Sequence, residues 1–146
     1  MWNRLTERTR RAVYHADDEA RRYGSSSVFP DHMLLGIIVD PNSVAVRILT
    51  GLGLSMDTVR TEIVKDIPKT LVGKQDKMEL SPDGRKALDN AYIAARELDN
   101  SYIGTEHLLL GLMRVSDGRV NRLLTQLGAG EEAILKAMTA LQDEDS

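Results

Sequence analysis

An internal repeat constrains the fold of this chain more than any other feature of its sequence. Residues 104–112, GTEHLLLGL, have a counterpart in residues 29–37, FPDHMLLGI, and the differences 106 − 31, 107 − 32 and 111 − 36 all equal 75. A constant separation indicates one structural unit written twice, so the fold is expected to contain two similar halves. Each copy begins with an acid and a histidine and continues with an apolar run.

The composition is typical of a globular protein and excludes several kinds of site. Of the 146 residues, 42% are hydrophobic and 28% are charged, well outside the range of disordered chains. The net charge of −3 and the pI of about 5.6 lack the overall basic character of a nucleic-acid binder. The absence of cysteine excludes disulfides, thiolate metal ligands and a cysteine nucleophile.

The sequence predicts a cytoplasmic protein. Its start, MWNRLTER, carries charges almost at once and has no apolar core, so it does not look like a signal peptide. No apolar run approaches the length of a membrane span.

Helical periodicity runs through both copies. In the first helix, expected from Thr6 to about Tyr23, apolar or small residues recur at steps of three and four. No segment shows the sustained alternation of a strand. We therefore predict an all-α fold of eight helices, arranged as two four-helix repeats related by a pseudo-two-fold axis. One domain is expected over residues 1–146, with repeat one at about 1–67, a linker at about 68–79 and repeat two at about 80–142.

Capping residues predict where several helices begin. Thr6 and Ser81, again 75 residues apart, are expected N-caps because a hydroxyl oxygen there can accept a first-turn N–H. Pro30 suits the first helical position, where its missing N–H is no loss. Thr105 is the expected N-cap of the helix that carries Glu106.

At Ser81-Pro82, at residues 102–112 and at the Leu127-Gly128 turn, the chain resembles the Clp N-terminal repeat domain. In that family this is the substrate- and adaptor-receiving domain of Clp-type AAA+ unfoldases, and the likeness is strongest to the ClpC branch. The first copy has FPD at residues 29–31, where the family usually has Gly-Thr-Glu. The sequence contains no GxxxxGK[ST] nucleotide loop, so the resemblance implies an excised N-domain or a stand-alone relative.

The resemblance also implies a ligand, a phosphorylated arginine side chain, for each repeat. Glu106 would hold the guanidinium and the helix start at Ser81 the phosphate, with Asp31 and Thr6 as the first-copy counterparts. The chemistry suits these groups, because a carboxylate accepts paired N–H donors and a helix N-terminus attracts phosphate. The competing interpretation is that the hydroxyls only cap helices and the acids only complement helix dipoles.

We assign the two repeat histidines a structural role. Neighbouring helical residues diverge by about 100°, so His32 and His107 do not direct a second ligand toward the point that the preceding acid reaches. A histidine that fixes the helix start is the preferred interpretation, and no metal or other cofactor is expected. No Ser-His-acid order is visible, so no enzyme activity is predicted, although Asp31 and Glu106 could pair across the pseudo-symmetry axis.

The resemblance implies a second, apolar surface that adaptors and cyclic peptides use. It would comprise Trp2, Val13 and Leu80, with Arg10 and Tyr14 nearby. Tryptophan and arginine are frequent anchors of protein interfaces. The alternative is that Trp2 packs between the repeats as part of the core.

The function expected from these features is that of a non-catalytic protein-binding domain in the Clp unfoldase and protease system, with ATPase modules in cis or in trans. One alternative is a stand-alone adaptor or regulator that docks onto a partner Clp unfoldase. Another is a nucleic-acid-binding helical protein that uses the arginines of the first helix. Those arginines more simply form a solvated face, balanced by acids of the same helix: Glu7, Asp17, Asp18 and Glu19.

Overall fold

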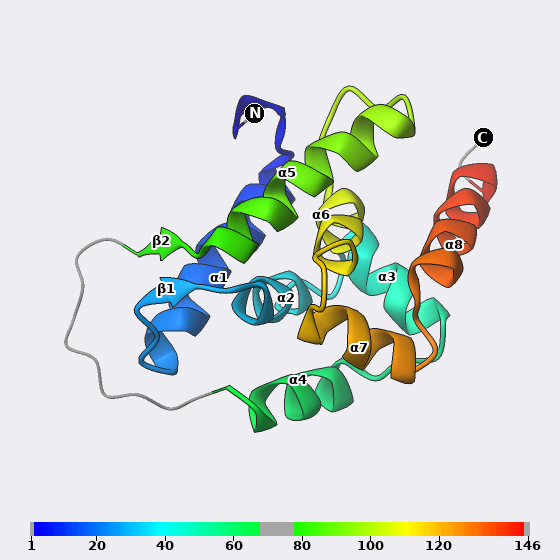
Figure 1. Cartoon of the computed structure of the whole chain (residues 1–146). Helices are drawn as coiled ribbons and strands as arrows, with labels where there is room; N and C mark the ends of the chain where they lie inside the picture. The colour runs from blue at the N-terminus through cyan, green and yellow to red at the C-terminus, as the bar shows by residue number, and fades with distance from the viewer. Residues whose placement is uncertain (1, 68–77, 145–146) are drawn as a thin grey trace.

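The computed structural model describes residues 2–67 and 78–144, and within them the fold is all-α, as predicted (Figure 1). A short 3-10 helix, η1 (Trp2–Arg4), precedes the first long helix. The α-helices are α1 (Glu7–Arg22), α2 (Pro30–Ile38), α3 (Val44–Gly51), α4 (Met56–Lys65), α5 (Pro82–Glu97), α6 (Thr105–Met113), α7 (Arg119–Gln126) and α8 (Glu131–Glu144). Two strands of two residues each, β1 (Ser27–Val28) and β2 (Glu79–Leu80), complete the described elements.

The two halves repeat each other helix by helix. The first residues of α1 to α4, at positions 7, 30, 44 and 56, each lie 75 positions before the first residues of α5 to α8, at 82, 105, 119 and 131. Gly53 and Gly128 follow α3 and α7 with left-handed φ values of 92° and 93°, which a side chain would strain. Residues 68–77 of the expected linker lie outside the described residues, and Glu79 belongs to β2.

The predicted N-caps are confirmed at two of three positions. The side-chain oxygens of Thr6 and Ser81 accept the backbone N–H groups of Thr9 and Gly84, at 3.2 and 3.0 Å. The prediction for Thr105 is wrong, since Gly104 is the N-cap of α6. The Thr105 hydroxyl instead accepts the N–H of Ala45 at 3.1 Å, because it faces the first turn of α3 in the other repeat.

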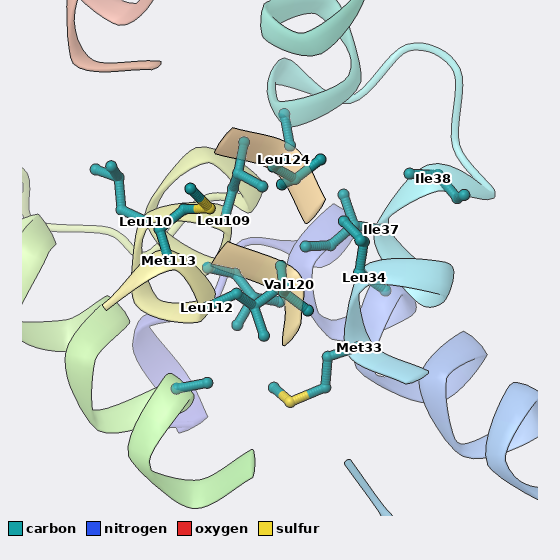
Figure 2. Packing of buried hydrophobic residues seen from close by; sticks show 14 of the residues in the cluster. Met33, Leu34, Ile37, Ile38, Leu109, Leu110, Leu112, Met113, Val120 and Leu124 are labelled. Carbon is teal, nitrogen blue, oxygen red and sulfur yellow. The ribbon is translucent and has the colours of Figure 1, made fainter. Parts of the chain in front are cut away.

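Helices α2 and α6 form the centre of the core. Figure 2 shows side chains of α2, α6 and α7 pointing toward one another, among them Met33, Ile37, Leu109, Leu112 and Leu124. All five are at most 2% exposed. Both central helices are apolar on nearly every side, a composition that suits a helix covered by neighbours all round.

Short backbone pairings cross between the two repeats. Strand β1 pairs in parallel with β2, in the register Ser27–Glu79 and Val28–Leu80, and Figure 1 shows the two arrows side by side. On the other side of the pseudo-axis, Leu5 forms a parallel bridge with Ile103. The start of α1 therefore lies beside the start of α6, and the start of α5 beside the start of α2. Strands of two residues are too short to show alternation in a sequence.

None of the described helices is both long enough and apolar enough to cross a membrane.

Candidate functional site

A pocket at Glu106 combines residues of both repeats. It encloses about 490 Å³ between the start of α6 and the start of α1. We call it the Glu106 pocket, and its walls are Thr6, Glu7, Arg8, Arg11, Val44, Tyr102, Gly104, Thr105 and Glu106.

The Glu106 carboxylate is nearly buried, and no described residue supplies it with a cationic partner. The residue is 8% exposed, and within the described part of the chain it forms no ion pair. Burial raises the pKa of its carboxyl above the ordinary value, and a hydrogen bond from its own backbone N–H partly opposes this rise. An acid held this way favours a ligand that supplies positive charge.

Gly104 makes room for this carboxylate. A Cβ atom on Gly104 would overlap the Oε1 atom of the Glu106 carboxylate, whose side chain folds back over the N-cap. The first repeat has Phe29 at this position and the shorter Asp31 as its acid. The two repeats therefore differ both in the N-cap residue and in the length of the acidic side chain that follows it.

The opposite wall of the Glu106 pocket is positively polarised. It holds the start of α1, where helix geometry leaves the N–H groups of Glu7 and Arg8 without helical acceptors. Arg8 pairs with Asp40 at 2.5 Å, and Arg11 with Glu7 at 3.4 Å. Both arginine side chains are about half exposed, at 48% and 56%, so they can reorient toward an anion in the pocket.

The first repeat has an equivalent pocket at Asp31, also of about 490 Å³. We call it the Asp31 pocket, and its walls are Ser25, Ser26, Phe29, Pro30, Asp31, His32, Asp66, Ile67, Asp83, Val115, Asp117, Gly118 and Arg119. Unlike Glu106, Asp31 is paired: Arg119 of α7 donates to its carboxylate. Arg119 also contacts Asp66 at 3.3 Å and donates to the Ile63 carbonyl at 3.2 Å.

The structure combines the four predicted ligand residues differently from our expectation. Glu106 shares its pocket with Thr6, whereas we expected Ser81. Asp31 shares its pocket with Asp83, in the first turn of the helix that Ser81 caps. The crossed strand pairings cause this exchange, because they place each helix start beside the acid of the other repeat. Ser81 itself is 2% exposed and is not among the residues that line either pocket.

The histidines fix the helix starts, as predicted. The Nδ1 atoms of His107 and His32 accept the N–H groups of Gly104 and Phe29, at 2.8 and 3.0 Å. Burial lowers the pKa of each imidazole to about 4. Among the described residues, no group of three or more His, Cys, Asp or Glu side chains could hold a metal ion.

The two histidines differ at their other nitrogen. His107 Nε2 lies 2.8 Å from Asn100 Oδ1, to which it donates because Nδ1 already accepts. His32 Nε2 is buried and has no hydrogen-bond partner within residues 2–67 and 78–144. Ser25 stands 75 residues before Asn100, and its hydroxyl donates to the Ser27 carbonyl at 2.6 Å instead.

Comparison with known proteins decides the family. Residues 4–127 match the family described as the Clp repeat (R) N-terminal domain. This chain belongs to that family.

Relatives of this Clp repeat domain are much longer proteins. The chain is 33% identical over 132 residues to the negative regulator of genetic competence ClpC/MecB of Bacillus subtilis, covering 88% of this chain and 16% of the relative. It superimposes on the N-terminal domain of ClpD from Arabidopsis thaliana with a TM-score of 0.74 and 28% identity, covering 96% of both chains. The ClpV N-domain in complex with a VipB peptide has the same fold, with a TM-score of 0.75, 19% identity, and coverage of 92% and 89%.

The residues of the predicted apolar surface of the Clp repeat domain belong to three elements, η1, α1 and β2. Trp2 is 44% exposed, so it is not part of the core. Its ring packs edge-on against the ring of Tyr14, with the two ring centroids 6.1 Å apart. Arg10 donates to the Trp2 carbonyl at 3.5 Å. Val13 packs half-buried against the core, and Leu80 lies on β2, apart from η1 (Figure 1). Direct contacts join Trp2 to Arg10 and to Tyr14.

Acids of α1 and nearby elements balance its arginines, as predicted for a solvated face. Arg11, Arg21 and Arg22 pair with Glu7, Asp17 and Glu19 of the same helix.

Sequence reasoning missed two residues that distinguish the pockets of this Clp repeat domain. Arg119 occupies the position at which the first repeat has Val44, and Arg8 the position at which the second has Asp83, since 119 − 44 and 83 − 8 both equal 75. A comparison of the repeats outside the motif at residues 29–37 and 104–112 would have revealed both.

Proposed function

We propose that this Clp repeat domain is a non-catalytic receptor for protein substrates, and that the Glu106 pocket receives a phosphorylated arginine side chain. The observation that carries the proposal is the nearly buried Glu106 carboxylate, which has no ion-pair partner among residues 2–67 and 78–144 and lies opposite a helix start and two arginines.

The two ends of a phosphoarginine side chain match the two walls of the pocket. The Glu106 carboxylate can accept two N–H donors of a guanidinium in a bidentate pair. The phosphate would lie at the N-terminus of α1, where free N–H groups, the helix dipole, Arg8 and Arg11 favour an anion. The lining of the pocket contains two acids, Glu7 and Glu106, and two arginines, Arg8 and Arg11. Equal numbers of negative and positive side chains suit a ligand that carries both signs of charge.

The similar proteins support a role in binding protein partners. A structure of the same fold, the ClpV N-domain, is named as a complex with a peptide. The relative ClpC/MecB is about six times longer than its match to this chain, so the Clp ATPase modules that would act on the bound substrate are part of the proposal, in cis or in trans. We propose the cytoplasm as the place of action.

Calorimetric titration with free phosphoarginine tests the proposal. We expect the wild-type domain to bind and Glu106→Gln to lose about tenfold or more in affinity, because the variant removes one charged acceptor. Glu132→Gln is a matched control, since Glu132 is also the second residue of its helix but is exposed. No binding by the wild type, or equal binding by Glu106→Gln, would refute the proposal.

A second proposed contact involves Trp2, Arg10 and Tyr14. The exposed rings of Trp2 and Tyr14 form an aromatic pair near the start of the chain, which suits an adaptor, a cyclic peptide or a partner Clp unfoldase. Trp2 is the sole tryptophan, so its fluorescence reports directly on this surface. We expect a Clp ATPase without its own N-domain to shift this emission, and Trp2→Phe to weaken the association. An unchanged emission at saturating ATPase would contradict this contact.

A further inference from the structure

The two pockets have similar volume but different charge. The Asp31 pocket is lined by four aspartates and one arginine: Asp31, Asp66, Asp83, Asp117 and Arg119. Its counterpart has equal numbers of acids and arginines. A phosphate that suits the Glu106 pocket would therefore meet an excess of carboxylates in the Asp31 pocket, and like charges repel.

Arg119 shows that the Asp31 pocket can hold a guanidinium. Its Nη1 atom donates to the Asp31 carboxylate, while Nη2 lies 3.3 Å from Asp66 Oδ2 and 3.2 Å from the Ile63 carbonyl oxygen. The set of acceptors for a planar, forked cation is thus already assembled. The Arg119 side chain remains 28% exposed at the mouth of the pocket, so a competing cation can reach the same acceptors.

His32 supplies an independent sign of a missing ligand. The residue is 3% exposed and lines the pocket, and its Nε2 atom has no acceptor within residues 2–67 and 78–144. Because Nδ1 accepts the N–H of Phe29, the proton of the neutral ring is on Nε2. In the other repeat the equivalent donor meets Asn100, and the position equivalent to Asn100 is Ser25, another wall of the Asp31 pocket. A buried donor without an acceptor is unfavourable, so a carbonyl oxygen that reaches Nε2 would be stabilised.

We propose that the Asp31 pocket receives an unphosphorylated arginine of a peptide, and that Arg119 is its displaceable internal occupant. The peptide guanidinium replaces that of Arg119 between Asp31 and Asp66, and a peptide carbonyl accepts the proton of His32 Nε2. Phe29, 42% exposed at this pocket, offers a ring face to the aliphatic part of the ligand. The domain would then read two states of arginine in two pockets, and this second site does not depend on the ligand of the first.

The test is an NMR titration of the domain with N-acetyl-arginine amide, a probe that has both the guanidinium and the carbonyl acceptors. In the wild type, Arg119 competes with the probe and lowers its apparent affinity. We expect Arg119→Met, which keeps the aliphatic stem, to bind the probe about fivefold or more tightly, with shifts at Phe29 and Ile67. Equal or weaker binding by a folded Arg119→Met domain would overturn the proposal.

Two further variants keep the result decisive if Arg119→Met does not fold. Asp31→Asn is expected to abolish the probe-induced shifts at Phe29 and Ile67, and unchanged shifts would contradict the proposal. Glu132→Gln, at an exposed position of α8, is expected to leave these shifts intact. Loss of the shifts in Glu132→Gln, or phosphoarginine binding at Phe29 and Ile67 as tight as that of the probe, would also overturn it.

Discussion

Gly111 of α6 lies so close to α5 that a Cβ atom added to it would be 2.8 Å from the backbone nitrogen of Ala91. The first repeat has the same relationship between α2 and α1, since a Cβ atom added to Gly36 would be 2.7 Å from the backbone nitrogen of Ala16. In both repeats the obstacle is backbone, which cannot rotate away. The absence of a side chain at these positions lets α2 pack closely against α1 and α6 pack closely against α5.

Gly111→Ala should therefore destabilise the domain strongly. We expect a loss of about 3 kcal/mol in the free energy of unfolding, because α5 and α6 must separate to admit the methyl group. Urea unfolding followed by circular dichroism measures it. Gly51→Ala is the matched control, since nothing lies within 4 Å of its added Cβ. Equal stability of the two variants would refute the packing argument.

Gly104→Ala should affect binding far more than stability. The added methyl group meets the end of the flexible Glu106 side chain, which can turn aside at small cost but then leaves its place in the pocket. We expect phosphoarginine affinity to fall by about tenfold while the free energy of unfolding changes by less than about 1 kcal/mol. Gly130→Ala, directly before α8, is the control because its added Cβ makes only ordinary contacts. Unaltered affinity in Gly104→Ala would contradict the role given to Gly104.

The buried histidines predict a loss of stability in mild acid. Burial lowers the pKa of His32 and His107 from 6.5 to about 4. Between these values the unfolded chain binds a proton at each histidine and the folded chain does not. The free energy of unfolding should therefore be fully retained above pH 6.5 and fall toward pH 4, by up to about 1.4 kcal/mol per pH unit for each histidine.

Urea titrations between about pH 7 and pH 5 on the wild type and on His107→Gln measure this contribution. The glutamine amide oxygen can still accept a hydrogen bond, and the carboxyl groups titrate in both proteins. We expect a shallower pH dependence in the variant. Parallel curves would show that His107 is protonated equally in both states.

Asn100→Ser would give the second repeat the residue of the first at this position. It removes the acceptor of the His107 Nε2 proton, and the His107 residue is 0% exposed. A loss of about 1–2 kcal/mol in the free energy of unfolding is expected, the usual cost of leaving a buried donor unpaired. The exchange Asn121→Ser, at a position whose amide donates to Met113 at the end of α6, controls for loss of a side-chain amide. Full stability of Asn100→Ser would mean that His107 finds another acceptor.

Local signals predicted the helices because each signal acts within a few residues. The hydroxyls of Thr6 and Ser81 bond to N–H groups three positions later, and the stripes of α1 and α5 depend only on helical spacing. The error at Thr105 has a tertiary cause. Its hydroxyl oxygen accepts the backbone N–H of Ala45, 60 residues away, and no local sequence pattern predicts that contact.

The candidate residues could be predicted, but not how they combine. A separation of 75 holds for Thr6 and Ser81 and equally for Asp31 and Glu106, so it is compatible with pairing inside a repeat or across the two. In the structure, the pairings of β1 with β2 and of Leu5 with Ile103 place each acid beside a helix start of the other repeat. A long-range contact likewise places Arg119, whose partner Asp31 is 88 positions away.

The crossed pairings of β1 with β2 and of Leu5 with Ile103 make each half unable to complete itself. Cut at the linker, either half would lose the backbone partner of its first helix and the second wall of its pocket. Two copies of one half could supply these to each other about a two-fold axis, as the subunits of an isologous homodimer do. The chain is thus built as a tandem dimer, and joining the subunits has allowed their two pockets to differ in charge, which identical subunits cannot do.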